Sequence, residues 1–450
     1  MSFPTYPNYR ESGVEWLGRV PSNWTTAKLK RIASFSGGGT PSRDQASFWN
    51  GAIPWVSPKD MKSEVITTSE EMITDEALAA SATSLVPPGA VLLVVRSGIL
   101  RHTVPVAINE VEVSLNQDMK ALRFNSSYCD PRFFFRWVQG LNDELILAWS
   151  KPGATVESIE HQYLAETVMA LPSLPEQRTI VAFLDRETAK IDALVEEQRR
   201  LIKLLKEKRQ AVISRAVTQG LDPTVPMKDS GVEWLGDVPA HWNVTSVGRL
   251  CEQLSYGFTN PMPTSADGPF MLTANDIGDG EVRFETARRT TLEAFDTLLT
   301  EKSRPQPGDI LLTKDGTLGR IAVFDGTLSC INQSVAFLRP KVDLVSSDYL
   351  AAALADGVYQ DRMIYEAGGT TIKHIYISRL AKMPIAIPPL DEMKQLEKFC
   401  LIHRAAAQQL SIAADAAVTL LNERRAALIS AAVTGKIDVR ATGTPQAEAA

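Results

Sequence analysis

The chain has 450 residues, of which 44% are hydrophobic and 22% are charged, and its formal net charge is −6. This composition is ordinary for a folded protein, so it excludes wholesale disorder, and the length predicts two to four domains. No apolar run is long enough to cross a membrane, the N-terminus lacks a secretory pattern, and the four cysteines form no CxxC pair, so we expect a cytoplasmic protein. The acidic balance means that any binding to nucleic acid must use local basic patches or partner proteins.

The sequence of the first half of the chain predicts short strands and helices followed by one long helix. The clearest strand covers residues 90–95, a β-rich run bounded by proline and glycine. A helix is expected over residues 131–147, because Asp130 can cap it and Pro131 suits its first turn.

A long helix is predicted to begin at Ser173, which forms a capping box with Glu176, and to end before Gly220. Apolar residues recur along it near a heptad spacing, which predicts a packing seam. The seam residues are Ile180, Leu184, Ile191, Leu194, Leu201, Leu205 and Val212.

The second half of the chain predicts the same order of elements. Residues 309–313 predict a strand, and a second long helix follows residues 387–392. Its seam residues are Leu396, Cys400, Ala407, Leu410, Ala417, Leu421 and Leu428. Because one seam is bulky and the other is rich in alanine, we expect the helices to pack as a close antiparallel pair. The alternative is that each helix packs only on its own domain.

The two halves are related by an internal duplication. Residues 11–24 and 229–242 are identical at ten of fourteen positions, with an offset of 218. Residues 212–218 and 428–434 are identical at five of seven positions, with an offset of 216. Such a period is too long for a solenoid and predicts two copies of one module. A duplicated module has approximate two-fold symmetry, as duplex DNA has, and two-fold proteins read half-sites spaced by whole helical turns.

The order of these motifs is GVEWLG-x-VP-x-x-W, a variable region, LPxLPEQ and a long helix ending in AVT, after which the series recurs. It resembles the specificity (S) subunits of type I restriction–modification systems, over essentially all of residues 11–438. The second copy departs from this pattern, because it has IPPLDE at residues 387–392 where the first has LPSLPE.

The resemblance implies an α+β fold class with two homologous globular target recognition domains. Two long antiparallel, coiled-coil-like helices separate these domains in a pseudo-two-fold internal repeat. The expected divisions are residues 1–170 for recognition domain 1, 171–222 for conserved helical region 1, 223–386 for recognition domain 2, 387–438 for conserved helical region 2 and 439–450 for a disordered tail.

The resemblance also implies a function. Each recognition domain would read one half of a split, asymmetric site in double-stranded DNA, and the helices would set the spacing and dock two modification (adenine methyltransferase) subunits. This chain would bind no cofactor or metal and catalyse nothing, since S-adenosylmethionine, ATP and Mg would be bound by the modification subunits and by two restriction subunits. The alternative is a scaffold that assembles partner proteins through the helices without binding DNA.

Two motifs raise the possibility of an adenine methyltransferase. Residues 35–39 match F-x-G-x-G, and residues 130–133 resemble the D-P-P-F loop. We reject this assignment because Arg132 replaces the second proline, residues 30–33 before Phe35 do not form a buried strand, and no acidic residue follows in a βαβ context.

Hydrolytic and metal chemistry find little support. Asp276, Asp279 and Glu281 are clustered, but without a nuclease pattern a solvated turn is the better interpretation. The five histidines lie apart, and no Walker loop or G-x-S-x-G elbow occurs.

Candidate DNA contacts are polar or basic side chains in loops that follow the predicted strands, because base edges and phosphates need such donors and acceptors. The same residue types also suit turns and buried backbone groups. The candidates are Thr40, Ser42, Arg43, Lys59, Arg96, Arg101, His102, Gln117, Lys151, Thr155, Thr259, Asn260, Asn275, Lys314, Arg320, Gln333, Thr370, Thr371 and Lys373. The repeated Trp16, Trp24, Trp234 and Trp242 are expected to pack or to dock partners, because residues shared by both copies cannot distinguish two half-sites.

Overall fold

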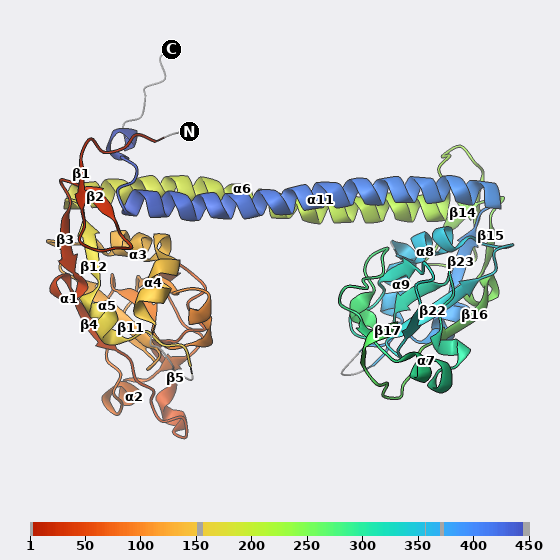
Figure 1. Ribbon diagram of the computed structural model, residues 1–450, viewed down its shortest axis with the longest axis horizontal. Coiled ribbons are helices and arrows are strands. Elements are labelled where there is room, and N and C mark those ends of the chain that lie inside the picture. The colour runs from red at the N-terminus through yellow and green to blue at the C-terminus, as the bar shows by residue number, and fades with distance from the viewer. Residues whose placement is uncertain (1–2, 151–155, 356, 370–372, 444–450) are drawn as a thin grey trace, which may run out of the picture. The chain divides into compact units, whose positions relative to one another are not determined.

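The computed structural model describes residues 3–150, 156–355, 357–369 and 373–443 (Figure 1). The chain divides into two units, of which unit 1 contains residues 1–198 and 416–450 and unit 2 contains residues 199–415. Both divisions fall within the long helices α6 (Leu174–Gln219) and α11 (Leu390–Val433). Each unit therefore combines a globular part with one segment of each helix.

Unit 1 is built on a five-stranded sheet with the order β4-β11-β8-β9-β6 and a three-stranded sheet with the order β10-β5-β7. The first sheet contains β4 (Ala33–Gly37), β11 (Met119–Phe124), β8 (Val91–Val94), β9 (Val106–Asn109) and β6 (Val65–Ile66). The second contains β10 (Ser114–Leu115), β5 (Trp49–Val56) and β7 (Met72–Ile73). The strand predicted over residues 90–95 is confirmed as β8. Its side chains alternate between two hydrophobic clusters, which explains why it is buried on both faces.

The expected helix over residues 131–147 is two helices, α3 (Pro131–Gly140) and α4 (Asn142–Trp149). The predicted cap is confirmed, because the Asp130 carboxylate accepts a hydrogen bond from the backbone N–H of Arg132. The Asn142 side chain accepts hydrogen bonds from the β8–β9 loop, which fixes the bend between the helices. α3 lies beside the helical pair (Figure 1), and a Cβ at Gly140 would be 2.9 Å from the backbone nitrogen of Ser430. The glycine thus permits the close approach of α3 to α11.

The N-terminal part of each copy forms a hairpin and one strand that pairs with the strand before the long helix. In unit 1 these are β1 (Tyr9–Glu11), β2 (Arg19–Pro21), β3 (Thr25–Lys28) and β12 (Val168–Leu171). In unit 2 they are β13 (Met227–Asp229), β14 (Asp237–Pro239), β15 (Asn243–Ser246) and β23 (Pro384–Ile387). Trp24 and Trp242 are buried, as a packing role requires, whereas Trp16 and Trp234 are half-buried.

The capping box predicted at the start of α6 is wrong in one respect. The carboxylate of Glu176 accepts hydrogen bonds from the Trp24 indole and the Tyr6 hydroxyl, at 3.0 and 2.7 Å, rather than turning back to Ser173. Buried donors compete successfully for this acceptor, because leaving them unpaired costs more than an uncapped helix end. In unit 2 the Trp242 indole donates to Glu392 at 3.0 Å, so both copies share the contact.

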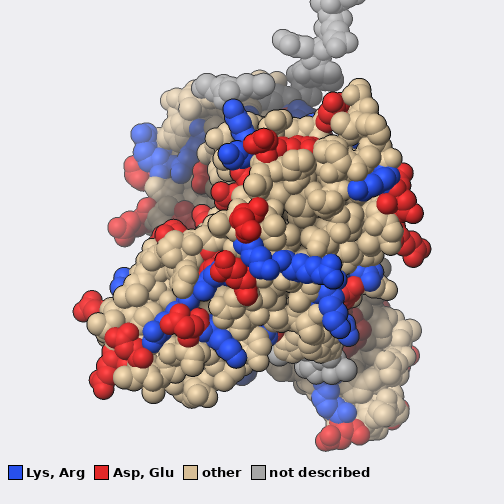
Figure 2. All heavy atoms as spheres, turned by 90° about the vertical axis from the view of Figure 1, so that its right-hand side faces the viewer, with Lys and Arg blue, Asp and Glu red and all other residues tan. Residues whose placement is uncertain are grey.

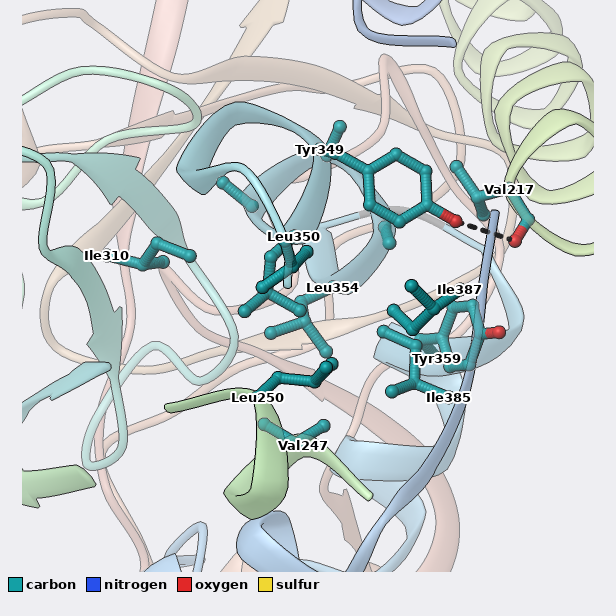
Figure 3. Packing of buried hydrophobic residues seen from close by; sticks show 14 of the residues in the cluster. Val217, Val247, Leu250, Ile310, Tyr349, Leu350, Leu354, Tyr359, Ile385 and Ile387 are labelled. Carbon is teal, nitrogen blue, oxygen red and sulfur yellow. Dashed lines mark hydrogen bonds between the residues drawn. The ribbon is translucent and has the colours of Figure 1, made fainter. Parts of the chain in front are cut away.

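Unit 2 has two corresponding sheets, a four-stranded one with the order β16-β22-β19-β20 and a three-stranded one with the order β18-β17-β21. The first has one strand fewer than its counterpart in unit 1. The strands are β16 (Cys251–Tyr256), β22 (Val335–Pro340), β19 (Ile310–Thr313), β20 (Ile321–Val323), β18 (Arg288–Arg289), β17 (Ser265–Leu272) and β21 (Ser329–Ile331). β19 is the strand predicted over residues 309–313. Tyr349 joins α8 (Ser347–Ala355) to the rest of the core, since its hydroxyl lies 3.2 Å from the backbone oxygen of Ala386 on β23 and 3.5 Å from that of Val217 on α6. Figure 3 shows the contact with Val217.

Shorter helices complete the globular parts. They are α1 (Leu29–Ile32), α2 (Asp75–Ala79) and α5 (His161–Glu166) in unit 1, and α7 (Leu292–Leu298), α9 (Val358–Tyr365) and α10 (Ile377–Lys382) in unit 2. Within the described residues, no helix is both long and apolar enough to cross a membrane.

The antiparallel pairing of α6 and α11 is confirmed within each unit. In unit 1, Arg425 of α11 is bound to Asp192 of α6 at 2.9 Å. The predicted seam of α6 is partly wrong, because Leu194 is 51% exposed whereas Val195 is 5% exposed. Leu201 is likewise exposed and Ile202 is half-buried. Apolar residues at adjacent positions leave the phase of a heptad pattern open, and packing on the partner helix selects the second of each pair.

The seam predicted for α11 needs a similar correction. Leu396 and Cys400 are buried, but Leu410 is 53% exposed, and the buried position in its turn is Ala414. Within the tail expected to be disordered, Arg440–Gly443 form a short 3-10 turn. Residues 444–450 lie outside the described residues.

Candidate nucleic-acid interface

In unit 1 the loop after β4 lies directly against the turn between β10 and β11. The backbone N–H of Gly39 donates to Leu115 O at 2.9 Å, and a Cβ at Gly38 would be 2.0 Å from Asn116 O. Only glycine fits such an approach. The same contact brings two predicted DNA contacts together, because the Thr40 hydroxyl is hydrogen-bonded to the Gln117 side chain, and both residues are exposed.

Arg43 is held in an aromatic cage. Its guanidinium lies 4.1 Å from the ring of Trp49 and 5.0 Å from that of Trp55, and it binds the Glu71 carboxylate with both terminal nitrogens. The hydrogen bond from Arg43 lowers the pKa of Glu71. Since this pairing occupies the two nitrogens that would read guanine, Arg43 must exchange partners before it can contact a base. Ser42 is exposed, and its carbonyl accepts a hydrogen bond from the Trp49 indole.

The remaining candidates of unit 1 surround the end of β8. Arg96 lies 3.9 Å from the Asp118 carboxylate, Arg101 lies 3.2 Å from Glu157, and His102 is exposed. Lys59 is exposed at an open hollow of about 670 Å³. All of these side chains are accessible to a large ligand.

In unit 2 the equivalent loops come together in the same way. The N–H of Phe258 donates to Ile331 O at 3.0 Å, and a Cβ at Gly257 would be 1.7 Å from that oxygen. The adjacent candidates Thr259, Asn260 and Gln333 are exposed.

Lys314 belongs to a polar cluster that the sequence did not reveal as a unit. Asp315 accepts hydrogen bonds from Lys314 Nζ at 2.9 Å and, on its other oxygen, contacts His374 Nδ1 at 2.5 Å. Lys314 Nζ also lies 5.2 Å from the ring of Tyr256, which is 46% exposed. The signal for this cluster was the histidine beside Lys373, in a loop already expected to contact DNA.

The acidic group at residues 276–281 is only in part the solvated turn that the sequence predicts, because Asp279 and Glu281 are exposed whereas Asp276 is not. Asp276 is buried and closes a capping box with Thr273, accepting from its N–H and hydroxyl at 2.8 and 2.7 Å. Asn275 is exposed beside it, and Arg320 lines an open hollow of about 610 Å³ together with Glu281 and Arg283. No group of three potential metal ligands occurs among the residues that the structure describes.

Four predicted contacts, Lys151, Thr155, Thr370 and Thr371, lie outside the described residues. Lys373 is described and exposed. On the face of the molecule drawn in Figure 2, basic and acidic side chains are interspersed, in keeping with the net charge of −6.

The two motifs that resembled a methyltransferase have other structural roles. Residues 35–37 end β4, an edge strand that runs antiparallel to β11, so no parallel strand leads into a helix there. Asp130 and Pro131 start α3 as its cap and first residue.

A family model described as the type I restriction modification DNA specificity domain matches residues 21–204 and 268–402. The chain is 34% identical over 198 residues to the EcoR124I/EcoR124II specificity subunit of Escherichia coli, a match that covers 44% of this chain and 46% of that protein. It is 25% identical over 290 residues to the EcoBI specificity subunit of Escherichia coli, covering 63% of this chain and 60% of that protein. The matches thus span about half the length of these two relatives.

Solved structures show the same fold. One, described as the structural basis of complex assembly and conformational transition of the type I R-M system, has a TM-score of 0.68 at 18% identity and covers 92% of this chain and 98% of its own. The HsdS subunit from Thermoanaerobacter tengcongensis has a TM-score of 0.51 at 17% identity and covers 93% of this chain and 98% of its own.

These structures share the fold of this chain, in which a duplicated α+β module ends each time in a long antiparallel helix. The family model covers most of the chain, so this chain belongs to the type I restriction–modification DNA specificity family.

Proposed function

We propose that this chain reads a split, asymmetric DNA site, with one half read by each unit, and that it catalyses no reaction itself. The observation that carries the proposal is the duplicated set of loops at the strand ends. In both units, glycines at equivalent places (Gly38 and Gly257) let a loop lie against the next turn, and exposed polar side chains surround that contact. Exposed polar side chains in fixed loops suit contacts with base edges and phosphates.

The helical pair is proposed to set the spacing between the half-sites and to dock two modification subunits. Support comes from apolar side chains of α11 that remain exposed in unit 2, namely Leu401, Ile402, Leu410 and Ile412. Exposed apolar residues concentrated on one element are typical of protein interfaces. The modification subunits would bind S-adenosylmethionine and methylate adenine, and two restriction subunits would use ATP and Mg, in the cytoplasm.

The test is genome-wide adenine methylation in a methylation-free host. Cells express a cognate modification subunit with and without this chain. We expect a split motif with two unlike halves that appears only when this chain is present. A soluble complex that produces no new motif would contradict the proposal.

The alternative function is a scaffold whose globular parts bind no DNA. The net negative charge and the interspersed surface charges favour it. A gel shift with and without the modification subunit decides between the two functions, because only a DNA reader produces a shift that depends on sequence.

A further inference from the structure

Unit 1 contains a junction of three segments at the end of β8. The N–H of Val95 donates to Asp118 O at 2.8 Å, and the N–H of Ile159 donates to Val95 O at 2.8 Å. An isolated antiparallel bridge pairs Arg96 with Ser158. The end of β8 is thus fixed on one side by the β10–β11 turn and on the other by residues around Ser158.

Unit 2 contains the same junction at the end of β19. The N–H of Lys314 donates to Ser334 O at 2.9 Å, and the N–H of Ile375 donates to Lys314 O at 2.9 Å. The corresponding isolated bridge pairs Asp315 with His374. The hydrogen bonds therefore match one to one, which makes position 96 equivalent to 315, 118 to 334, 157 to 373, and 158 to 374.

Some side chains at the junction are the same in both units. Thr40 corresponds to Thr259 and Gln117 to Gln333. Asn116 and Asn332 also correspond, and each accepts a hydrogen bond at 3.0 Å from the N–H two residues further on. These shared residues build the frame and cannot make the half-sites differ.

Four further positions differ between the two units, and the charge is reversed at two of them, 96/315 and 157/373. Unit 1 has Arg96, Asp118, Glu157 and Ser158, whereas unit 2 has Asp315, Ser334, Lys373 and His374. Arg96 has a 61% exposed side chain, and the side chain of His374 is 41% exposed. Both sets can therefore reach a ligand from the same place in the fold.

The chemistry of the two sets suits different bases. A guanidinium such as that of Arg96 donates two hydrogen bonds to guanine, whereas carboxylates accept from cytosine. In unit 2, Asp315 contacts Nδ1 of His374, which leaves Nε2 on the opposite side of the ring.

We infer that positions 96, 118, 157 and 158, with their equivalents 315, 334, 373 and 374, are the specificity-determining positions that make the two DNA half-sites different. The ligand of each set is the base-pair edges of one half-site. This inference rests on the proposed function and adds to it the residues that carry the asymmetry.

The test selects DNA from libraries in which one half-site is randomised while the other is held at the wild-type sequence. The protein is the full chain in complex with its modification subunit. The first variant carries Arg96→Asp, Asp118→Ser, Glu157→Lys and Ser158→His together. We expect its half-site 1 consensus to change toward that of half-site 2, with half-site 2 unchanged. An unchanged consensus in half-site 1, or an equal change in both halves, would overturn the inference.

If the fourfold variant binds no DNA, conservative single variants test the inference instead. Arg96→Lys keeps the charge but removes the paired donors, and His374→Asn keeps a polar side chain. Each should relax discrimination at one base position by about tenfold, in half-site 1 and half-site 2 respectively. Wild-type discrimination in both variants would refute the inference.

Charge-reversed controls distinguish this effect from a general change of charge. Glu144→Arg on α4 and Lys302→Glu are exposed substitutions outside the junction, and they should leave both half-sites unchanged. If the wild-type complex selects no split motif, the proposed function fails. If it selects one that the junction variants leave unchanged, only the inference fails.

Discussion

Glu176 and Glu392 occupy the same position in the two copies but differ in their surroundings. Glu176 is 7% exposed and accepts from the Tyr6 hydroxyl and the Trp24 indole. Glu392 accepts from the Trp242 indole and contacts the exposed His241, and its side chain is 25% exposed. In unit 1 the second partner of the glutamate is thus the buried Tyr6 hydroxyl of the N-terminal segment. In unit 2 it is the exposed imidazole ring of His241.

We expect Glu176→Ala to lower the free energy of unfolding by about 2–4 kcal/mol, because it leaves two buried donors unpaired. Glu176→Gln retains an acceptor and should cost less. Glu392→Ala should also cost less, because water can replace the carboxylate. Urea unfolding followed by tryptophan fluorescence measures the differences. Equal losses for Glu176→Ala and Glu392→Ala would contradict the assigned role of burial.

Glu64, which directly precedes β6, joins the globular part of unit 1 to the helical pair. It binds Arg136 of α3 at 3.2 Å and Arg425 of α11 at 3.0 Å, and these cations are also bound by Asp185 and Asp192. Burial acts to raise the pKa of Glu64, but the hydrogen bond from Gln139 and the two cations outweigh it and hold the pKa below the ordinary 4.5.

A lowered carboxyl pKa stabilises the fold above the unfolded value, and that stability is lost as the pH falls through the folded value. We therefore expect unit 1 to lose stability below about pH 4.5, and Glu64→Gln to reduce this loss. Thermal unfolding between pH 3 and pH 6 measures it. Glu70→Gln is the matched control, because the Glu70 side chain is 56% exposed in an ion pair with Lys62. A pH profile that is unchanged by Glu64→Gln would refute the prediction.

For the two long helices, the sequence determines the length, whereas packing determines which side chains face the partner helix. α6 has no proline or glycine beyond its first turn, so its length follows from propensity and from Gly220, whose φ of 78° suits a helix end. Which side chains face α11 follows instead from the fit of the two surfaces. Val195 and Leu194 test this distinction, because they are adjacent and similar in chemistry.

Val195→Asp should lower stability by about 2–3 kcal/mol, since it places a carboxylate in the seam. Leu194→Asp should change stability by less than about 0.5 kcal/mol, because that side chain is exposed. Circular dichroism during thermal unfolding compares the two variants. The reverse order of effects would show that the seam runs through Leu194.

At the scale of the whole molecule, the division into units falls within both long helices. Under the proposed function, the length of these helices determines the spacer of the DNA site. Seven residues added to each helix, after Gln198 and after Asp415, preserve the heptad seam and lengthen the pair by about 10 Å.

We expect this double insertion to widen the spacer by about three base pairs and to leave both half-sites unchanged. Sequencing of methylated DNA reads the spacer directly. A pair of glycine-rich heptads of the same length is the control, because it breaks the helices and should abolish the motif. An unchanged spacer would mean that the helices do not set it.

Much of the fold follows from the sequence because it depends on local patterns. The strands at residues 90–95 and 309–313 and the cap at Asp130 are indicated by neighbours along the chain. The bend at Leu141 could not be predicted in this way, because it depends on contacts between Asn142 and a loop some forty residues away.

The candidate site was predictable only as a set of loops. Lys314 and Gln333 can be recognised individually by their chemistry and by their position after strands. Asp315 and His374 cannot be recognised as a pair, because they lie 59 positions apart in the sequence and only an isolated β-bridge brings them together.

The duplication, the order of the elements and the family can be predicted from the sequence, because they depend on repeated motifs and short-range periodicity. Three features depend on the folded chain: which of two adjacent apolar residues enters the helical seam, which donors bind the Glu176 carboxylate, and which loop side chains share a junction. The physical reason is that these choices are made by packing and by competition for hydrogen bonds between segments far apart in the chain.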